Sequence, residues 1–439
     1  MAPIYKEANF PPDYREAEVR QIMDAVYRLR SICITGLAGM GKSNVVRFVV
    51  SHPQVRARYL RDKADDYAFV HVDCAGLPRG DEAEVLGEIV AQLHYEGFAP
   101  DDPHPSPVPR SMRHALREQV LGVEPGLNLA LVLDYFDEAA ARLDKAFFNY
   151  LFYLRNARPQ GNLSYIFATR RPMGYLGELQ ELLDDGCVVG PLGHEDALGS
   201  IRRDEARLGC AFSAAQRDEL IACTGGHPGF LKNAAELLCS GQVDTNLPGE
   251  KVARQLLQSG RVENLCEELW NDLTPAEQSV LLKAATNALP PRSGDDARVA
   301  YLERSGLLVR ERERHAIFCP LFELFVRDRA AVPGAVSIAA EFPNLARIET
   351  SMREEKVTLS PRLFALLLAL TEARGRVLPT DELIIRAYGD EAGGVTNAAL
   401  SQLVKRLRGA LNPRAQRMAN DPTYTCVETV RGVGYRFNG

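Results

Sequence analysis

The sequence predicts a multidomain chain of class α/β + α, in which a parallel sheet flanked by helices comes first and smaller helical units follow. The chain has 439 residues, enough for roughly two to four domains. Its first half alternates apolar runs with amphipathic helical patterns, which is typical of a parallel, doubly wound sheet. From about residue 195 the helical patterns continue and extended runs become few and short.

Composition limits the class of protein. Hydrophobic residues make up 46% and charged residues 25%, as in ordinary globular domains. The formal net charge is -6, so any nucleic-acid contact has to be a local basic patch. No apolar stretch approaches the roughly 18 residues of a membrane span, and the N-terminus does not resemble a signal peptide. The nine cysteines contain no Cys-x-x-Cys pair; we expect reduced thiols in a cytoplasmic protein without membrane contact.

The strands of the predicted sheet are five apolar runs, at residues 31–35, 67–73, 129–134, 165–169 and 187–192. Helical patterns lie between them, for example at residues 82–95 and 145–155. Ligands of such sheets bind beyond the carboxyl ends of the strands, so the loops that follow these five runs are the first place to look for chemistry.

The loop after the first run fits G-x-x-x-x-G-K-[ST] in full, since it reads GLAGMGKS over residues 36–43. It follows a predicted strand and opens a predicted helix, the context in which this P-loop motif cradles phosphates. We expect it to bind ATP or ADP with Mg²⁺, Lys42 reaching the β- and γ-phosphates and Ser43 holding the metal ion. The expected nucleotide-binding residues are Gly36, Gly39, Gly41, Lys42, Ser43 and Asn44.

Two later strand ends complete the expected site. The run LALVLD ends in Asp134, a Walker B pattern whose carboxylate orients the Mg²⁺ shell. Asp137 and Glu138 follow shortly, and either is a candidate base. The next strand ends in Arg170, whose guanidinium could sense the γ-phosphate. The alternative for each is a turn-forming or surface residue at a strand end.

The P-loop, the LVLD run, the ATR run ending in Arg170 and the later GGHP run together resemble the STAND branch of the AAA+ ATPases. The resemblance implies a helical lid in which Gly226, His227 and Pro228 match the element that lies against the nucleotide base. It also implies that Arg15 belongs to a motif flanking the adenine. Tyr135 stands where many AAA+ ATPases carry a catalytic glutamate, so the resemblance implies slow hydrolysis.

The same resemblance organises the rest of the chain. We expect a nucleotide-binding domain at 1–193, a helical lid at 194–250 and a middle winged helix at 251–332. A linker at 333–345 and a C-terminal domain at 346–439 complete the layout. In the middle domain, TPAE at residues 274–277 predicts a capping box, and the expected core is Trp270, Leu273, Leu281, Leu307 and Phe322.

The last eighty residues predict a second winged helix: three helices, then two strands around a turn. The third helix, predicted at 396–411, places Leu400, Val404, Leu407 and Leu411 on one apolar stripe. Polar and basic side chains suited to phosphates and base edges occupy its opposite face and the hairpin. The expected DNA-binding residues are Asn397, Ser401, Gln402, Lys405, Arg406, Arg408, Arg431 and Arg436.

The runs LVKRLRGAL and VETVRGVGYRF resemble the OmpR/PhoB-type winged helix-turn-helix. The resemblance implies that the third helix enters the major groove through Lys405 and Arg406 and that the hairpin contacts DNA through Arg431. Charge agrees, because residues 396–439 carry seven basic and two acidic side chains in a chain of net charge -6. The alternative is a solvated basic face on a winged helix that binds protein.

Three functions are consistent with these patterns. The first is a nucleotide-switched transcriptional regulator with slow ATP hydrolysis, which binds double-stranded DNA and forms homo-oligomers in its ATP state. The second is a DNA-dependent ATPase of replication, transposition or defence, which strong stimulation of turnover by DNA would favour. The third is a signalling scaffold whose winged helices bind protein partners, which an absence of salt-dependent DNA binding would favour.

Overall fold

The computed structural model describes most of the chain: residues 5–98, 111–158, 162–171, 182–286, 289, 297–311, 314–331, 337–341, 344–349, 354–373, 375–419, 424–430 and 432–438. The chain divides into two compact units. The first comprises residues 1–221 and 226–239, and the second comprises residues 222–225 and 240–439. Most of the segment expected as a lid therefore belongs to the unit that holds the P-loop.

The first unit contains the predicted parallel sheet, whose five strands run in the order β2-β3-β4-β1-β5. The last strand ends earlier than predicted, because Gly190 and Pro191 follow and proline has no N–H for the ladder. The strands are β1 (Ile32–Thr35), β2 (Tyr67–Asp73), β3 (Asn128–Asp134), β4 (Leu163–Thr169) and β5 (Asp185–Val188).

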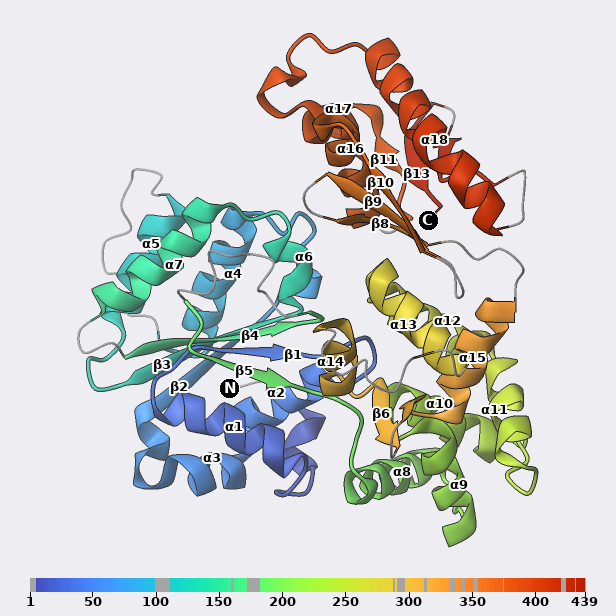
Figure 1. Cartoon of the computed structure of the whole chain (residues 1–439). Helices are drawn as coiled ribbons and strands as arrows, with labels where there is room; N and C mark the ends of the chain where they lie inside the picture. The colour runs from blue at the N-terminus through green and yellow to red at the C-terminus, as the bar shows by residue number, and fades with distance from the viewer. Residues whose placement is uncertain are drawn as a thin grey trace. The chain divides into compact units, whose positions relative to one another are not determined.

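Helices cover both faces of this sheet (Figure 1). One face carries α1 (Glu16–Tyr27), α2 (Lys42–Ser51) and α3 (Pro53–Leu60). The other carries α4 (Glu82–Tyr95), α5 (Met112–Gly122), α6 (Phe136–Ala140) and α7 (Lys145–Ala157). Every strand except the edge strand β5 is buried along almost its whole length, as expected of a sheet covered on both sides.

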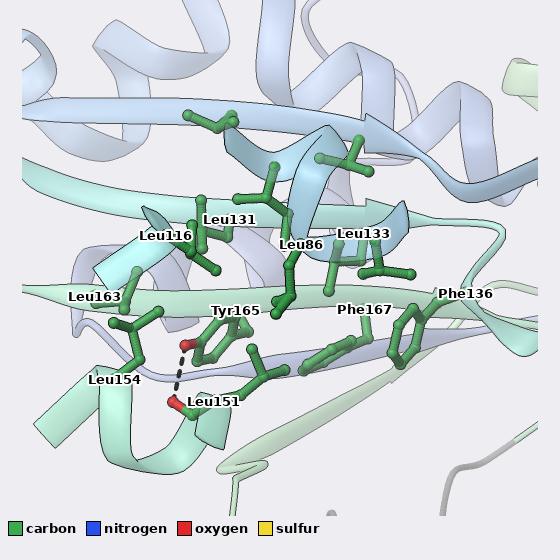
Figure 2. Close-up of a cluster of buried hydrophobic side chains, with 14 of the residues drawn as sticks. Leu86, Leu116, Leu131, Leu133, Phe136, Leu151, Leu154, Leu163, Tyr165 and Phe167 are labelled. Atoms are coloured by element: carbon green, nitrogen blue, oxygen red, sulfur yellow. Dashed lines mark hydrogen bonds between the residues drawn. The ribbon is translucent and has the colours of Figure 1, made fainter. Parts of the chain in front are cut away.

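The larger core lies between the sheet and helices α4 to α7 (Figure 2). Leu131 and Leu133 of β3 and Phe167 of β4 are fully buried there. Tyr165 is also fully buried, and its hydroxyl donates a 2.9 Å hydrogen bond to the carbonyl of Leu151, so its polar atom is satisfied. Burying each such side chain stabilises the fold by about 1.5–3 kcal/mol, which makes this sheet a rigid support for the loops at its carboxyl edge.

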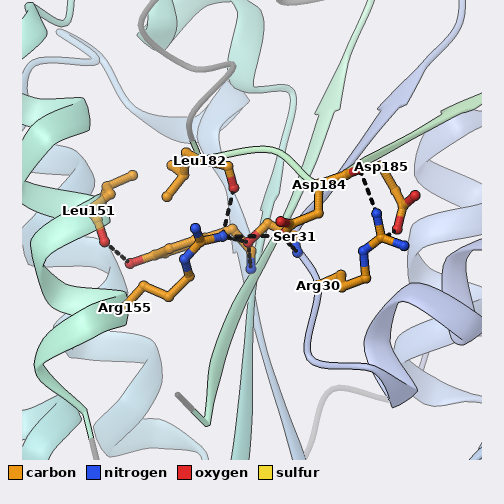
Figure 3. A network of polar contacts seen from close by, with 8 residues as sticks. Arg30, Ser31, Leu151, Arg155, Leu182, Asp184 and Asp185 are labelled. Atoms are coloured by element: carbon orange, nitrogen blue, oxygen red, sulfur yellow. Dashed lines mark hydrogen bonds and ion pairs between the residues drawn. The ribbon is translucent and has the colours of Figure 1, made fainter.

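A polar network holds the amino end of β1, at the end of the strand away from the P-loop (Figure 3). The Arg155 guanidinium donates to the carbonyl of Leu182 at 3.0 Å and to the Asp184 carboxylate at 3.1 Å. The same carboxylate accepts the backbone N–H of Ser31 at 2.8 Å, and Arg30 donates to the Asp184 carbonyl. Helix α7 and the segment before β5 are thereby joined to β1.

The stretch expected as a lid is helical and contains α8 (His194–Leu208), α9 (Ala214–Thr224) and α10 (Pro228–Cys239); all of these residues except 222–224 belong to the first unit. Helices α8 and α10 pack against each other, and Arg207 of α8 donates a 2.9 Å hydrogen bond to Glu236 of α10.

The second unit begins with α11 (Gly249–Leu257), α12 (Gly260–Asn271), α13 (Pro275–Ala285) and α14 (Ala297–Arg304). An antiparallel pair follows, β6 (Leu308–Glu311) and β7 (Arg314–Ile317), and then α15 (Pro320–Ala331). The predicted capping box is confirmed, since Thr274 and Glu277 each accept the other's backbone N–H. All five expected core residues are buried: Trp270, Leu273, Leu281, Leu307 and Phe322.

The C-terminal part starts with an antiparallel sheet of β8 (Ser337–Glu341), β9 (Leu345–Glu349) and β10 (Glu354–Thr358). Part of the stretch expected as a linker, 333–345, is thus regular strand, because Ile338 faces a buried cluster that also holds Ile348. Helices α16 (Pro361–Glu372) and α17 (Thr380–Tyr388) follow, with the short β11 (Leu378–Pro379) between them.

Helix α18 (Asn397–Ala419) and a hairpin of β12 (Val427–Val430) and β13 (Gly434–Phe437) complete the winged helix. The helix contains Pro413 and ends at Ala419, eight residues beyond its predicted end at residue 411. Its apolar stripe also continues, since Leu411 and Ala415 are both fully buried. Gly409, whose carbonyl loses a partner at Pro413, is exposed, so water can satisfy that carbonyl. Among the described residues, none of the helices combines the length and apolar character needed to cross a membrane.

Candidate nucleotide site and candidate nucleic-acid interface

The P-loop joins β1 to α2, which begins at Lys42. Gly39 and Gly41 have φ of 71° and 85°, a left-handed conformation that glycine adopts without strain. A Cβ at Gly36 would lie 2.6 Å from the carbonyl oxygen of Val189, so that position has no room for a side chain. A Cβ at Gly41 would lie 3.6 Å from Pro228 and 3.8 Å from Asn44, which therefore flank it.

Ser43 and Asp134 form the candidate metal site. The Ser43 hydroxyl donates a 3.1 Å hydrogen bond to Oδ1 of Asp134, and the backbone N–H of Tyr135 donates to the same oxygen at 3.0 Å. The second oxygen, Oδ2, is buried and has no hydrogen-bond partner among the described residues. An orphaned carboxylate oxygen next to a serine hydroxyl is the donor set that Mg²⁺ and its water shell use beside a P-loop, so these residues fit the ion.

His71 lies beside this carboxylate and did not emerge from the sequence. Its Nε2 is 3.7 Å from Oδ2 of Asp134, within ion-pair range but beyond a hydrogen bond, while Nδ1 is 2.9 Å from the hydroxyl of Tyr5. The parallel register of β2 and β3 creates this proximity, and it also aligns Asp73 with Asp134. The available signal was a histidine in the middle of a mostly apolar strand, YAFVHVD.

Asp137 and Arg170 are brought together at the ends of α6 and β4. The backbone N–H of Arg170 donates a 2.5 Å hydrogen bond to the Asp137 carboxylate. Burial raises the pKa of Asp137, although that hydrogen bond and the charge of Lys42 counteract the shift. A carboxyl group with a raised pKa is suited to accept a proton, and the Arg170 side chain is exposed. The side chain of Glu138, the other candidate base, lies outside the described part of the structure.

A lid residue, His227, and the N-cap residue of α1, Arg15, contact the P-loop backbone. His227 is fully buried and its Nε2 is 3.0 Å from the carbonyl oxygen of Ala38. Arg15 is 2% exposed and donates to the carbonyl oxygens of Met40 at 2.9 Å and Gly190 at 2.8 Å. The sequence singled out both residues, but as groups beside the base; here their polar atoms are directed to backbone carbonyls of the protein.

The candidate nucleic-acid interface is the outer face of α18. The predicted apolar stripe is buried, comprising Leu400, Val404, Leu407 and Leu411. The five predicted polar and basic side chains on the opposite face are exposed: Asn397, Ser401, Gln402, Lys405 and Arg406. The structure therefore presents these side chains together on one surface, the arrangement needed to contact phosphates and base edges, and the Ser401 hydroxyl also hydrogen-bonds the hydroxyl of Tyr435 in β13 at 3.0 Å.

The three remaining predicted DNA contacts differ from these five. Arg408 is half-buried and donates 2.8 Å hydrogen bonds to the carbonyl of Val427 and the hydroxyl of Thr429, so it joins α18 to the hairpin. Arg436 is exposed and pairs with Glu428 across the hairpin. Arg431 lies outside the described residues.

Comparison with known protein families identifies the C-terminal part. Residues 354–437 match the family model described as transcriptional regulatory protein, C terminal. The chain is 32% identical over 85 residues to the transcriptional regulator HilA of Salmonella typhi and of Salmonella typhimurium. That similarity covers 19% of this chain and only 14% of the length of these relatives. The chain therefore carries a C-terminal winged-helix domain of the transcriptional-regulator type.

Comparison with solved structures finds P-loop ATPases at low identity. The Walker-type ATPase PABY2304 of Pyrococcus abyssi aligns with a TM-score of 0.46 and 16% identity, over 71% of this chain and 95% of that one. The RuvB Holliday junction branch migration motor of Thermotoga maritima aligns with a TM-score of 0.35 and 13% identity, over 70% of this chain and 91% of that one. A chain of the structure of Drosophila ORC bound to DNA aligns with a TM-score of 0.37 and 14% identity, over 80% of this chain and 92% of that one.

Proposed function

We propose that this protein is a nucleotide-switched transcriptional regulator, in which ATP or ADP with Mg²⁺ in the first unit controls DNA binding by the C-terminal winged helix. The observation that carries the proposal is the presence, in one chain, of a full P-loop with its Ser43–Asp134 contact and of an 84-residue match to the DNA-binding part of transcriptional regulators.

In the proposed nucleotide site the P-loop amides and Lys42 bind the phosphates, and Ser43 and Asp134 hold Mg²⁺. The ion supplies charge neutralisation at the β- and γ-oxygens when it is bound. Asp137 is the candidate base in this proposal, because its carboxyl group has a raised pKa, feels the charge of Lys42 and accepts the backbone N–H of Arg170. Tyr135 follows the metal-binding aspartate at the position where the family resemblance implies a catalytic glutamate, so in this proposal hydrolysis is slow and acts as a reset.

In the proposed DNA complex, α18 enters the major groove and places Lys405 and Arg406 against phosphates and base edges. Arg408 supports the hairpin in this proposal, since its Nε and Nη2 donate to Val427 and Thr429. Arg431 and Arg436 of the hairpin supply further cationic contacts. Because each phosphate contact releases counterions, the affinity for DNA falls steeply with salt.

The finer features of the proposal follow the family resemblance. The chain is a STAND-type AAA+ protein with a nucleotide domain at 1–193, a lid at 194–250, a middle winged helix at 251–332 and the DNA-binding domain at 346–439. ATP favours an open, homo-oligomeric form that presents several winged helices to DNA and gains avidity. The nucleotide can shift this equilibrium only by its different affinity for the two forms.

The test is equilibrium binding to random duplex DNA against salt concentration, without nucleotide, with ADP and with a non-hydrolysable ATP analogue. We expect the analogue to tighten binding, Lys42→Ala to abolish that gain, and Arg431→Ala to weaken binding in every state. Lys283→Ala, on α13, is a charge-matched control for both variants. Equal DNA affinity with and without the analogue would refute the switch, and an absence of salt-dependent DNA binding would refute the regulator.

A further inference from the structure

Five consecutive carbonyl groups of the P-loop, from Gly36 to Met40, each accept a hydrogen bond from the first unit. Lys42 Nζ donates to the carbonyls of residues 36 and 37. His227 Nε2 is 3.0 Å from the carbonyl oxygen of Ala38, the backbone N–H of Gly229 donates to Gly39 at 3.2 Å, and Arg15 donates to Met40 at 2.9 Å. The last three donors come from outside the loop, two from the lid and one from the cap of α1.

The direction of these carbonyls determines the direction of the amides. A trans peptide is planar and its C=O and N–H point opposite ways. Fixing the carbonyls of residues 38 to 40 toward His227, Gly229 and Arg15 therefore turns the N–H groups of residues 39 to 41 away from these three donors, and the N–H of Met40 also donates to the carbonyl of Leu37 at 3.3 Å. A run of inward-facing N–H groups is the feature with which such a loop binds phosphate. The lid and Arg15 thus fix the orientation of the loop backbone over residues 38 to 40.

The protonation of His227 is determined by its two partners. Nδ1 accepts the backbone N–H of Phe230 at 3.2 Å, so His227 caps the N-terminus of α10. A neutral ring that accepts at Nδ1 carries its proton on Nε2 and therefore donates to the carbonyl of Ala38. Burial lowers the pKa of His227 to about 4, so the ring is neutral near pH 7. Both ring nitrogens are used by backbone groups.

Arg15 acts at the far end of the same loop. It has φ of 47°, and its guanidinium is ion-paired with Glu18 at 2.7 Å. Its Nη2 bonds to the carbonyls of both Met40 and Gly190, and its backbone N–H donates to the Asp196 carboxylate of α8 at 3.1 Å. Arg15 therefore connects the P-loop with the segment that enters the lid.

We propose that His227 and Arg15 are positioning residues, which act on the phosphates through the P-loop backbone and do not read the nucleotide base. The lid senses an occupied P-loop through the carbonyls of Ala38 and Gly39. This inference rests on the proposed binding of nucleotide at the P-loop. It assigns to the two residues a role different from the base contact that the family resemblance implies.

Two substitutions separate the two bonds of His227. In His227→Asn the side-chain oxygen can replace Nδ1 as the cap of α10, but the side chain is too short to reach Ala38. In His227→Gln the longer amide can again donate to Ala38. His194→Ala, an exposed histidine at the start of the same lid, is the matched control. The probes are ATP, GTP and inorganic tripolyphosphate, which has no base.

We expect His227→Asn to lower the affinities for ATP, GTP and tripolyphosphate by the same factor, about tenfold, because a buried P-loop carbonyl loses its hydrogen-bond donor. His227→Gln should recover part of this loss, and His194→Ala should match the wild type. The inference is overturned if tripolyphosphate affinity does not change, or if only the preference between ATP and GTP changes.

A second readout needs no nucleotide. Amide hydrogen exchange in the ligand-free full chain should be faster across residues 36–44 in His227→Asn than in the wild type, and unchanged in His194→Ala. If wild-type protein binds neither ATP nor tripolyphosphate, the proposed nucleotide function fails, while exchange still tests the positioning of the loop. Equal exchange in His227→Asn and the wild type would refute the positioning role whether or not nucleotide binds.

Discussion

The hydroxyl of Ser43 and the carboxylate of Asp134 lie 3.1 Å apart, although 91 residues separate them in the chain. Ser43 is at the start of α2 and Asp134 is the last residue of β3, two strands away from β1 in the sheet. The second Asp134 oxygen is buried without a hydrogen-bond partner among the described residues. We therefore expect the binding of a metal ion at this pair to depend on the negative charge of that carboxylate.

The first prediction concerns Mg²⁺. In Asp134→Asn we expect the gain in ATP affinity on adding Mg²⁺ to be lost, because the amide removes the charge that holds the metal shell. Affinity for ATP in EDTA should stay within about twofold of the wild type. Asp73→Asn, at the paired position of β2, is the control and should keep the gain. Fluorescent-nucleotide titrations with and without Mg²⁺ measure both values; an unchanged gain in Asp134→Asn would exclude this metal site.

The second prediction concerns the hairpin pair Glu428 and Arg436, whose side chains meet at 2.5 Å. Glu428→Gln should tighten binding to duplex DNA about threefold to tenfold and steepen its salt dependence, because it removes an acidic group and releases a cation. Glu311→Gln, an exposed acid on β6, matches the change in net charge and should have no effect. Weaker binding by Glu428→Gln would show that the pair positions the hairpin.

The third prediction separates contact from support on α18. Arg408→Ala should lower the free energy of unfolding of the C-terminal domain by about 1–2 kcal/mol, since two 2.8 Å hydrogen bonds to the hairpin are lost. Lys405→Ala should leave that stability within about 0.5 kcal/mol and reduce the slope of log K against log salt by about one. Denaturant unfolding and salt titrations distinguish the variants, and identical behaviour of the two would contradict the assignment.

The fourth prediction concerns Gly434 in the hairpin signature. A Cβ there would lie 1.9 Å from the carbonyl oxygen of Leu378, so β13 could not pair with β11. Gly434→Ala should destabilise the domain by about 3 kcal/mol or more. Gly409→Ala, at an open position of α18, should stabilise it by up to about 1 kcal/mol. Thermal unfolding of the full chain compares the two.

The fifth prediction is a pH dependence. The pKa of His227 is lowered from an ordinary 6.5 to about 4 by burial, so the unfolded chain binds the proton more readily. Its contribution of about 3 kcal/mol is present above pH 6.5 and is lost as the pH falls toward 4. Unfolding free energies measured from pH 7 to pH 4 should therefore fall more steeply in the wild type than in His227→Asn. Parallel curves for the two proteins would mean that another group, not His227, takes up the proton on unfolding.

Local patterns were sufficient wherever a side chain acts within its own element. The P-loop follows from eight adjacent residues, and α4 begins and ends where its amphipathic pattern does. The stripe of α18 is buried as its spacing predicts. The exceptions are element ends: β5 stops early, before Gly190 and Pro191, and α18 continues through Pro413, beyond which Ala415 is still buried.

The sequence patterns did not predict which groups the polar side chains contact. His71 reaches Asp134 only through the register of two parallel strands, and Arg15 reaches Met40 only because α1, the P-loop and the segment before α8 converge. Arg408 was predicted as a DNA contact, and only the folded chain shows that its Nε and Nη2 also donate to the hairpin. Charge and spacing specify what a side chain can bind, but burial and chain crossing select the partner.

The linear order of residues was therefore enough to specify a parallel sheet with a phosphate loop and a C-terminal winged helix, because backbone propensity and apolar periodicity act over a few residues. The folded chain alone decided which donors bond to the P-loop carbonyls and which basic residues of the winged helix are exposed or bonded to other residues of the domain. Those choices depend on contacts between groups far apart in sequence, whose energies exist only after the sheet, the lid and the hairpin have packed.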